Sequence, residues 1–319
     1  MRILFLGTSS FALPALKALA ESGHTLLSAV TQPDRPAGRG LHPQPSAVKR
    51  FALDRSIPLL QPEDIHHPDS LDRLRALKPE IAVVASYGVL LRKSLLELPV
   101  HGCINIHASL LPAWRGAAPV ARAIMSGEPK TGVAIFRIVR KLDAGPILGV
   151  RETEISPTET RGALEERLAN LGAGLLLETL REIESGSIRE SPQDEGLATY
   201  AHKIAHADGR IDWHRSCTEI ANLVRAFQPD PGAFARFRHG SREAVVTVIE
   251  ASPVAEGGQA SAGKIVGISA EGIAVACGGG GALLLRRLQP ESKRPMSAAD
   301  LANGYRLRVG DCLIASDSP

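Results

Sequence analysis

Cysteine is scarce in this sequence. Its 319 residues include four, Cys103, Cys217, Cys277 and Cys312, and they are scattered without a CxxC pair. Disulfide frameworks and structural zinc sites both need several closely or regularly spaced cysteines. We therefore expect four reduced thiols, no bound metal and a cytoplasmic protein.

Long apolar runs are missing as well. No stretch approaches the ~20 apolar residues that a membrane-spanning helix needs. Met1 and Arg2 lead directly into an apolar strand without the pattern of a secretory leader. The net charge of +3 is mildly basic. A charge of this size permits a polyanionic partner but does not require one, because nucleic-acid binders usually concentrate their charge.

Two phosphate-binding motifs are absent. The first apolar strand, residues 3–6, is followed by a turn with one glycine, Gly7, where a dinucleotide-binding fold has GxGxxG. The glycine-rich turn at residues 278–281 lacks the Lys-Ser/Thr pair of a P-loop. The sequence therefore gives little support to a dinucleotide or nucleoside-triphosphate site.

The length and composition are those of a soluble protein with two domains, since 44% of the 319 residues are apolar and 22% are charged. In the first part, continuous apolar strands such as 3–6 and 81–85 alternate with helical patterns, of which residues 161–184 are the longest. Buried strands that alternate with helices are typical of βαβ units. We predict an α/β fold whose first domain, residues 1–190, is a doubly wound, Rossmann-like parallel sheet.

The pattern changes after a polar link at residues 191–206. A capping box at Ser216 and Glu219 begins one helix. Five short alternating strands follow, at 235–237, 244–249, 264–268, 272–276 and 282–288. Short strands separated by glycine-rich turns predict a small antiparallel, OB-like β-barrel domain within residues 207–319. Its 13 basic and 12 acidic residues nearly balance, so its electrostatic attraction for a polyanion should be modest.

The most informative stretch is residues 102–119, GCINIHASLLPAWRGAAP. It begins as a strand in which Ile104 and Ile106 alternate with Asn105 and His107, so the amide and the imidazole share one face. A stiff turn and a proline-initiated helix follow. An α/β sheet builds its sites in this way, at the carboxyl ends of its strands.

This stretch resembles the formyltransferases that take their one-carbon unit from 10-formyltetrahydrofolate. In that family the strand reads N-x-H and is followed by SLLP, and an LDxG loop lies further on, here with Asp143 at 36 residues after His107. The WRGAAP run is typical of the branch whose acceptor is the amino group of methionyl-initiator tRNA. The resemblance covers nearly the whole chain, to about Leu313, and four motifs in order and at family spacing make it specific.

The resemblance and the chemistry agree on three catalytic residues. Attack of an amine on a formyl carbon needs a donor for the developing oxyanion, a group that holds a proton, and a carboxylate that tunes this group. We expect Asn105 to hold the formyl oxygen, and His107 to stabilise the oxyanion and assist proton transfer. Asp143 should orient His107 and raise its pKa, and it can position a water that takes the amine proton. The reaction needs no covalent intermediate and no metal.

The resemblance also implies where the formyl donor, 10-formyltetrahydrofolate, binds as a cosubstrate. Its pocket should be lined by the turn that follows the N-x-H strand and by the end of the strand at 81–85, with main-chain contacts to the pterin. The implied residues are Ser109, Leu110, Leu111, Pro112, Val84, Tyr87, Gly88 and Val89.

The loop at residues 33–46 is long, basic and rich in proline. In the tRNA-formylating branch this insertion enters the acceptor end, and the arginine of its PAGRG run, here Arg39, reads the weak first base pair. A planar guanidinium suits that task because it bonds base edges and phosphate together. We expect Arg39, Arg35 and Lys49 to contact tRNA, and we expect a monomer, because no interface stripe is apparent.

Two departures from the family pattern stand out. Residues 138–141, Ile-Val-Arg-Lys, replace the usual methionine, acid and glycine before LDxG, and Ser9-Ser10 stands where Pro-Asp is common. The first departure leaves two interpretations open: altered flexibility of the Asp143 loop, or a contact of Arg140 or Lys141 with RNA phosphate.

Two other functions compete with transfer to tRNA. The same formyl-folate chemistry can serve an amino sugar or water, although the PAGRG and WRGAAP runs argue against the sugar. An RNA-binding protein with an inactive α/β domain is the alternative without catalysis, and it has no use for Asn105, His107 and Asp143.

Overall fold

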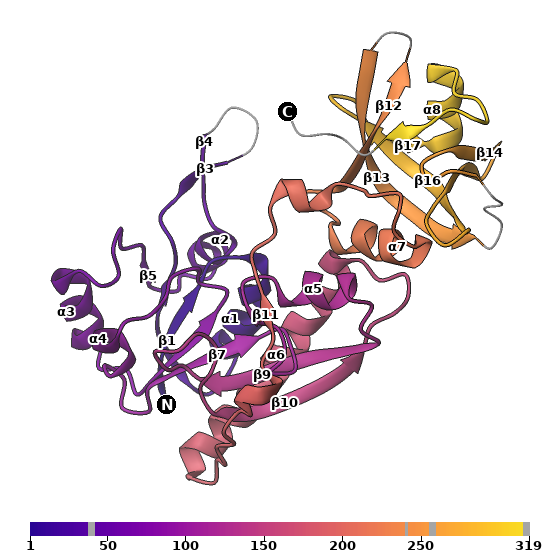
Figure 1. Ribbon diagram of the computed structural model, residues 1–319. Coiled ribbons are helices and arrows are strands. Elements are labelled where there is room, and N and C mark those ends of the chain that lie inside the picture. The colour runs from indigo at the N-terminus through magenta and orange to yellow at the C-terminus, as the bar shows by residue number, and fades with distance from the viewer. Residues whose placement is uncertain (38–41, 240–241, 255–259, 315–319) are drawn as a thin grey trace. The chain divides into compact units, whose positions relative to one another are not determined.

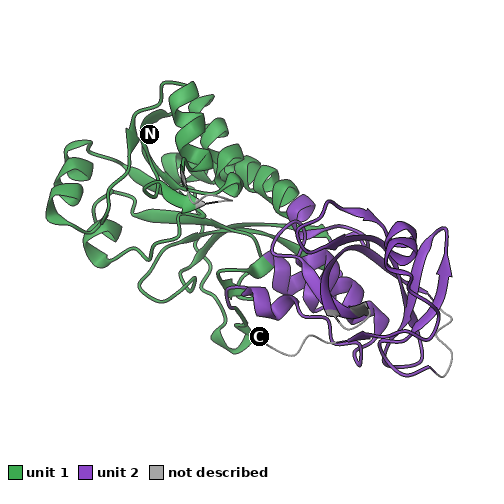
Figure 2. Cartoon of the chain, turned by 90° about the horizontal axis from the view of Figure 1, so that it is seen from above, with its two compact units in different colours: residues 1–119, 130–154, 165–201 green, residues 120–129, 155–164, 202–319 purple. Residues whose placement is uncertain are grey.

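The protein is described by a computed structural model of residues 1–37, 42–239, 242–254 and 260–314 (Figure 1). The chain forms two compact units, coloured separately in Figure 2. Unit 1 comprises residues 1–119, 130–154 and 165–201, and unit 2 comprises residues 120–129, 155–164 and 202–319. The division at 190 and 206 that the sequence suggested stays a prediction.

Unit 1 is built on a seven-stranded sheet in the order β10-β9-β7-β6-β1-β2-β5. Its strands are β1 (Arg2–Gly7), β2 (Thr25–Val30), β5 (Leu59–Leu60), β6 (Ile81–Ala85), β7 (Cys103–His107), β9 (Lys130–Arg137) and β10 (Ile147–Glu154). The five strands from β5 to β7 are parallel, as the apolar runs predicted. Every residue of β6 is buried, as expected for a strand covered on both faces.

The two strands at the other edge run differently. β9 is antiparallel to β7, and β10 is antiparallel to β9. The loop between β9 and β10, residues 138–146, is too short for a crossover between parallel strands, which needs a dozen residues or more. The sheet is therefore Rossmann-like with an antiparallel edge, and the loop of that edge hairpin carries Asp143.

Helices and small strand pairs complete unit 1 (Figure 1). The helices are α1 (Leu13–Ala20), α2 (Ala47–Asp54), α3 (Pro68–Ala76), α4 (Lys93–Leu96) and most of α6 (Arg161–Ser185), with 3-10 turns at Ser10–Ala12 and Glu195–Leu197. β3 (Arg35–Ala37) pairs with β4 (His42–Gln44), and β8 (Arg115–Gly116) pairs with β11 (Tyr200–Ala201). Within the predicted loop at 33–46, the structure thus has a short hairpin.

Helix α6 packs on one face of the β7 region. A Cβ on Gly172 would lie 2.7 Å from Cγ2 of Ile106 and 3.2 Å from Cγ1 of Val133, so the helix backbone comes very close to the sheet there. A side chain larger than hydrogen would force the two apart. The isoleucine face of β7 is therefore covered by α6, which leaves Asn105 and His107 on the opposite face.

Unit 2 contains the second sheet, in the order β14-β15-β16-β13-β12-β18, with β17 beside β16. The strands are β12 (Ala233–His239), β13 (Arg242–Val254), β14 (Ile265–Ser269), β15 (Gly272–Ala276), β16 (Ala282–Pro290), β17 (Met296–Ser297) and β18 (Leu313–Ile314). Hydrogen bonds from Ile265 N to Asp311 O, 2.8 Å, and from Leu313 N to Gly263 O, 2.8 Å, join the two ends of this order. The predicted small antiparallel barrel is confirmed.

The helices of unit 2 are α5 (Pro119–Met125), α7 (Cys217–Ala226) and α8 (Ala298–Tyr305), with a 3-10 turn at His206–Gly209. Helix α7 begins with the predicted capping box, in which Ser216 and Glu219 bond each other's backbone N–H groups. Helix α8 was not predicted. Its N-cap, Ser297, accepts from Asp300 N at 3.0 Å, a signal of helix initiation that the sequence did carry.

Candidate active site

Asn105 and His107 lie at the carboxyl end of β7, on the face turned away from α6. In the register with β9, Asn105 is opposite Phe136 and His107 is opposite Ala134. Phe136 and Ala134 form an apolar cluster with Leu111 from the turn after β7. The alternation in the sequence therefore places an amide and an imidazole beside an apolar cluster on the same face of the sheet.

The imidazole of His107 is almost fully buried, with 6% of its surface exposed. Its Nε2 lies 2.9 Å from the carbonyl oxygen of Trp114, and its Nδ1 lies 3.9 Å from Oδ2 of Asp143. A carbonyl can only accept, so Nε2 carries the hydrogen in this contact. In the neutral ring Nδ1 is then the free acceptor, and it faces the carboxylate of Asp143.

Burial sets the charge of this imidazole. Loss of water around the ring lowers the pKa of His107 below its ordinary value of 6.5, and the nearby Asp143 and the Trp114 carbonyl offset this in part. The expectation that Asp143 raises the pKa of His107 is thus correct for the carboxylate alone, while burial decides the net direction. His107 is neutral at pH 7, with a lone pair on Nδ1 that can take a proton.

We expect His107 to titrate below pH 6.5, and Asp143→Asn to move the midpoint lower still, because the substitution removes the charge that favours the imidazolium. The ring proton chemical shift of His107, followed by NMR against pH and assigned by its loss in His107→Gln, measures both. A midpoint above 6.5 in the unaltered protein would contradict the assignment of a neutral ring.

The Asp143 loop is held from several sides. Oδ2 of Asp143 accepts from the backbone N–H of Gly116 at 2.8 Å, and the side chain is 15% exposed. The φ angle of Asp143 is 45°, in the left-handed region that aspartate tolerates better than most residues. Gly145 is equally constrained, because a Cβ there would lie 1.7 Å from the carbonyl oxygen of Arg137. Both residues of the motif are fixed by close backbone contacts.

Asn105 differs from its two neighbours because its amide is unengaged. The residue is half-buried, and within the part of the chain that the structure describes its side chain has no hydrogen-bond partner. An amide beside a buried imidazole and a carboxylate is a suitable donor for a carbonyl oxygen. The three groups therefore offer a donor, a proton acceptor and an anion in one place.

Comparison with known proteins identifies the family of this chain. A family model described as formyl transferase matches residues 1–180, and one described as formyl transferase, C-terminal domain, matches residues 203–306. The chain belongs to the formyl transferase family. It is accordingly a formyl-transferring enzyme.

Relatives in this family match over nearly the whole chain. The methionyl-tRNA formyltransferase of Pseudomonas syringae pv. tomato is 44% identical over 306 residues, 96% of this chain and 95% of that protein. The methionyl-tRNA formyltransferase of Methylococcus capsulatus is 43% identical over 307 residues, 96% of this chain and 98% of that protein.

A solved structure shows the same fold at low identity. HypX from Aquifex aeolicus, in complex with tetrahydrofolic acid, matches with a TM-score of 0.63 and 18% identity, and covers 98% of this chain. This chain spans 48% of that one.

The structure of this formyl transferase family member places the residues predicted to line the folate pocket in different environments. Ser109 is fully buried, and its Oγ donates to the carbonyl of Ala113 at 2.6 Å. Leu111 packs with Ala134 and Phe136, while Leu110 and Pro112 are half-buried in the same turn. Val84 and Tyr87 are buried, and Gly88 and Val89 are exposed. A role in binding folate stays a prediction for these residues.

A cavity of about 1140 Å³ opens in unit 1 next to the loop after β6. It is lined by Asp64, His66, Val89, Leu90, Leu91, Arg92, Lys93, Leu96, Glu97 and Arg140. Of the residues predicted to bind folate, Val89 is among those lining it. His66 fixes one wall, because its Nε2 lies 2.9 Å from the carbonyl of Leu90. The cavity mixes apolar and polar groups, as small-molecule pockets do.

The residues predicted to contact tRNA differ in their surroundings in the structure. Arg39 lies outside the described residues. Arg35 is exposed on β3. Lys49 on α2 is half-buried, and its Nζ donates to Asp34 Oδ2 at 2.7 Å. An RNA phosphate would therefore have to compete with Asp34 for the charge of Lys49, whereas Arg35 is open to solvent.

At both departures from the family pattern, the side chains make contacts within unit 1. Ser9 Oγ donates to Ser86 Oγ at 2.8 Å, which links the first βα turn to the loop after β6. Lys141 Nζ donates to Glu195 at 2.6 Å, while Arg140 lines the large cavity.

Sequence reasoning missed several residues that support the site. Arg115 is fully buried although it is charged, and it contacts Gln193 and Glu195 from the segment predicted as a polar link. An arginine inside the WRGAAP run was the available signal, since buried arginines need partners. Among the described residues no group of three metal-binding side chains comes together, and none of the described helices is long and apolar enough to cross a membrane.

Proposed function

We propose that the enzyme transfers the formyl group of 10-formyltetrahydrofolate to the free amino group of methionyl-initiator tRNA, giving N-formylmethionyl-tRNA for translation initiation. The observation that carries the proposal is the position of Nδ1 of His107, 3.9 Å from Asp143, on the strand face that also carries the unengaged amide of Asn105. The relatives named methionyl-tRNA formyltransferase, at 43% and 44% identity over 96% of the chain, support this acceptor.

Asn105 acts on the oxygen of the formyl group. As the amine attacks, negative charge builds on that oxygen, and a positioned amide N–H stabilises it. One such donor contributes on the order of 3 kcal/mol to lowering the barrier in comparable sites. The free amide of Asn105 needs no bond broken before it donates, which favours this role.

His107 acts on the proton of the attacking nitrogen. Its Nε2–H is occupied by the Trp114 carbonyl, so Nδ1 is the atom that accepts the proton. The imidazolium that results is stabilised by the carboxylate of Asp143, 3.9 Å away. It gives its proton to N10 of the folate as the bond between N10 and the formyl carbon breaks, so that tetrahydrofolate leaves. The same carboxylate is held by Gly116 N, so it does not need to reorganise during the step.

The same proposal puts the binding site of the folate donor in unit 1. The cavity beside Val89 and Arg140 is large enough for a ring system, since ligand pockets usually measure about 300–1,000 Å³. Arg140 comes from the loop of Asp143, and Val89 from the loop that follows β6. A pterin bound there would lie between the loop that follows β6 and the loop that carries Asp143.

The acceptor is recognised in part by the loop at 33–46. Its base is tied down by Asp34, whose two carboxylate oxygens accept from Lys49 at 2.7 Å and Gln61 at 2.9 Å. We propose that Arg39 and Arg35, the latter on β3, contact the acceptor end of the tRNA. A mispaired end of the acceptor stem costs little free energy to open, which suits recognition of a weak first base pair.

The experiment that tests the proposal supplies purified enzyme and 10-formyltetrahydrofolate with charged initiator tRNA, charged elongator tRNA, an amino sugar or buffer alone. We expect formyl-methionine with initiator tRNA and little free formate. Formate in buffer alone would favour water as acceptor, and a formylated sugar would favour the sugar. Binding of tRNA without any transfer would favour a protein that only binds RNA.

In the same assay, Arg39→Leu should sharply raise the KM for charged initiator tRNA while the KM for folate is unchanged, because the substitution removes a base and phosphate contact from the loop alone. Arg181→Leu, at an exposed arginine on α6, is the matched control for loss of one positive charge. Equal tRNA kinetics in both variants would remove Arg39 from the recognition model.

A further inference from the structure

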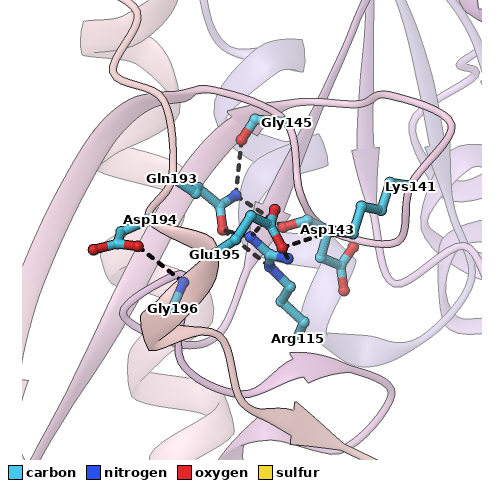
Figure 3. A network of polar contacts seen from close by, with 8 residues as sticks. All are labelled: Arg115, Lys141, Asp143, Gly145, Gln193, Asp194, Glu195 and Gly196. Carbon is cyan, nitrogen blue, oxygen red and sulfur yellow. Dashed lines mark hydrogen bonds and ion pairs between the residues drawn. The ribbon is translucent and has the colours of Figure 1, made fainter.

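The segment that follows α6 touches the catalytic loop through one side chain, Gln193. Its Nε2 donates to the carbonyl of Asp143 at 2.8 Å and to the carbonyl of Gly145 at 2.7 Å. Figure 3 shows the amide between the Asp143 loop and Arg115. The hydrogen bonds from Gly116 to the carboxylate and from Gln193 to the main chain therefore hold Asp143 at both ends.

The orientation of this amide is fixed by chemistry. Oε1 of Gln193 accepts from Nε of Arg115 at 3.1 Å and from Nη2 at 2.8 Å. An arginine can only donate and a main-chain carbonyl can only accept, so the oxygen must face Arg115 and the nitrogen must face the loop. Both hydrogens and both lone pairs of the amide are used. No other side chain of this size has two donors and two acceptors placed in this way.

Arg115 is in turn immobilised. It is fully buried, and its guanidinium bonds both carboxylate oxygens of Glu195 at 3.1 Å. Glu195 also accepts from Lys141, which lies two residues before Asp143. The contacts with Arg115 and Lys141 lower the pKa of Glu195 to about 2, so this carboxylate stays charged at neutral pH. The network begins and ends on the Asp143 loop.

We propose that Gln193 is a positioning residue for formyl transfer: through two main-chain carbonyls it fixes the Asp143 loop so that the Asp143 carboxylate stays within reach of Nδ1 of His107. Arg115 and Glu195 hold Gln193 in turn. The inference rests on the proposed role of Asp143 in catalysis. Gln193 touches neither reacting atom and acts through the loop.

Gln193→Glu isolates this role, because it keeps the shape and the oxygen that Arg115 contacts but removes both hydrogens. Two carboxylate oxygens cannot both avoid the main-chain carbonyls, so the loop should move away from His107. We expect kcat to fall about 10- to 100-fold, as displacements of about 1 Å can cause. The KM values for folate and tRNA should change little.

A second readout separates positioning from general stability. The charge that acts on the His107 ring comes from Asp143. The other groups next to this ring, among the described residues, are the Trp114 carbonyl and the Phe136 ring. If the carboxylate moves away, the NMR titration midpoint of His107 should shift to lower pH in Gln193→Met, which removes the two donors without adding a charge near the ring, as it does in Asp143→Asn. A variant that was merely less stable would unfold at lower temperature but keep the midpoint.

Asp194→Asn is the matched control. Asp194 is exposed in the same segment, and its recorded side-chain hydrogen bond is with the N–H of Gly196 at 2.9 Å. We expect it to leave both kcat and the His107 midpoint unchanged. If Gln193→Glu does not accumulate as folded protein, Gln193→Met takes its place with the same expectation, because it also lacks the two donors.

An unchanged His107 midpoint in folded Gln193→Met would overturn the inference, whatever the activity. The titration needs neither folate nor tRNA, so it can succeed or fail independently of the acceptor. If the unaltered enzyme formylates something other than tRNA, the midpoint still tests whether Gln193 holds the loop.

Discussion

His107→Ala is expected to lower kcat for formyl transfer by about 10³-fold, since general acid–base groups contribute about 10²- to 10⁴-fold. The substitution removes Nδ1, the atom that faces Asp143 at 3.9 Å and that takes the proton of the attacking amine. The hydrogen bond from Nε2 of His107 to the Trp114 carbonyl is lost as well. Single-turnover rates with saturating folate and charged initiator tRNA measure the effect.

His101→Ala is the control for this variant. His101 lies two residues before β7, and its side chain is exposed. We expect wild-type kinetics, because this ring is outside the site. Circular dichroism and melting temperature must show that His107→Ala remains folded, since the ring is buried against Phe136. If folded His107→Ala retains the rate of the unaltered enzyme, His107 does not transfer the proton.

Gly145→Ala is expected to have the second largest effect, on both stability and kcat. A Cβ at this position would lie 1.7 Å from the carbonyl oxygen and 2.9 Å from the carbonyl carbon of Arg137. Backbone atoms cannot rotate away as a flexible side chain can, so the loop between β9 and β10 must shift. Overpacking of this kind usually costs about 1–3 kcal/mol. The shift displaces Asp143, so kcat should fall about 10²-fold or more.

Gly174→Ala provides a control of opposite sign. Gly174 lies within α6, and a Cβ there would meet no atom within 4 Å. Alanine in a helix interior is favoured over glycine by roughly 0.5–1 kcal/mol, so this variant should gain stability and keep its kcat. Urea unfolding and steady-state kinetics compare the two. If Gly145→Ala matches Gly174→Ala in both measurements, the close approach to Arg137 does not hold the loop.

The sequence located the core of the site with some accuracy. Period-two alternation in INIH placed Asn105 and His107 on one face, and in the structure α6 covers the other face. Asp143 could be named because a family motif carries it, since nothing in local pattern links residues 36 positions apart. The apolar run at 81–85 and the alternating stretch at 104–107 also identified the central strands.

Other features were beyond local reasoning. The antiparallel direction of β9 relative to β7 depends on contacts that form only on folding, and so does β18, which pairs with β12 from far along the chain. The direction of the His107 pKa was also missed, because the loss of water around a ring depends on the residues packed over it, here Phe136 and its neighbours.

What the sequence by itself determined is the kind of chemistry: an amide and an imidazole on one strand face, a carboxylate in a recognisable loop, and two parts of different secondary structure. What only the tertiary structure decided is how these groups are held. Arg115, Gln193 and Glu195 are separated by up to 80 residues in the chain, and their hydrogen bonds exist only after folding brings the segment beyond α6 against the Asp143 loop. The distances between such groups and the burial of each group are set by packing, which no local pattern of residues encodes.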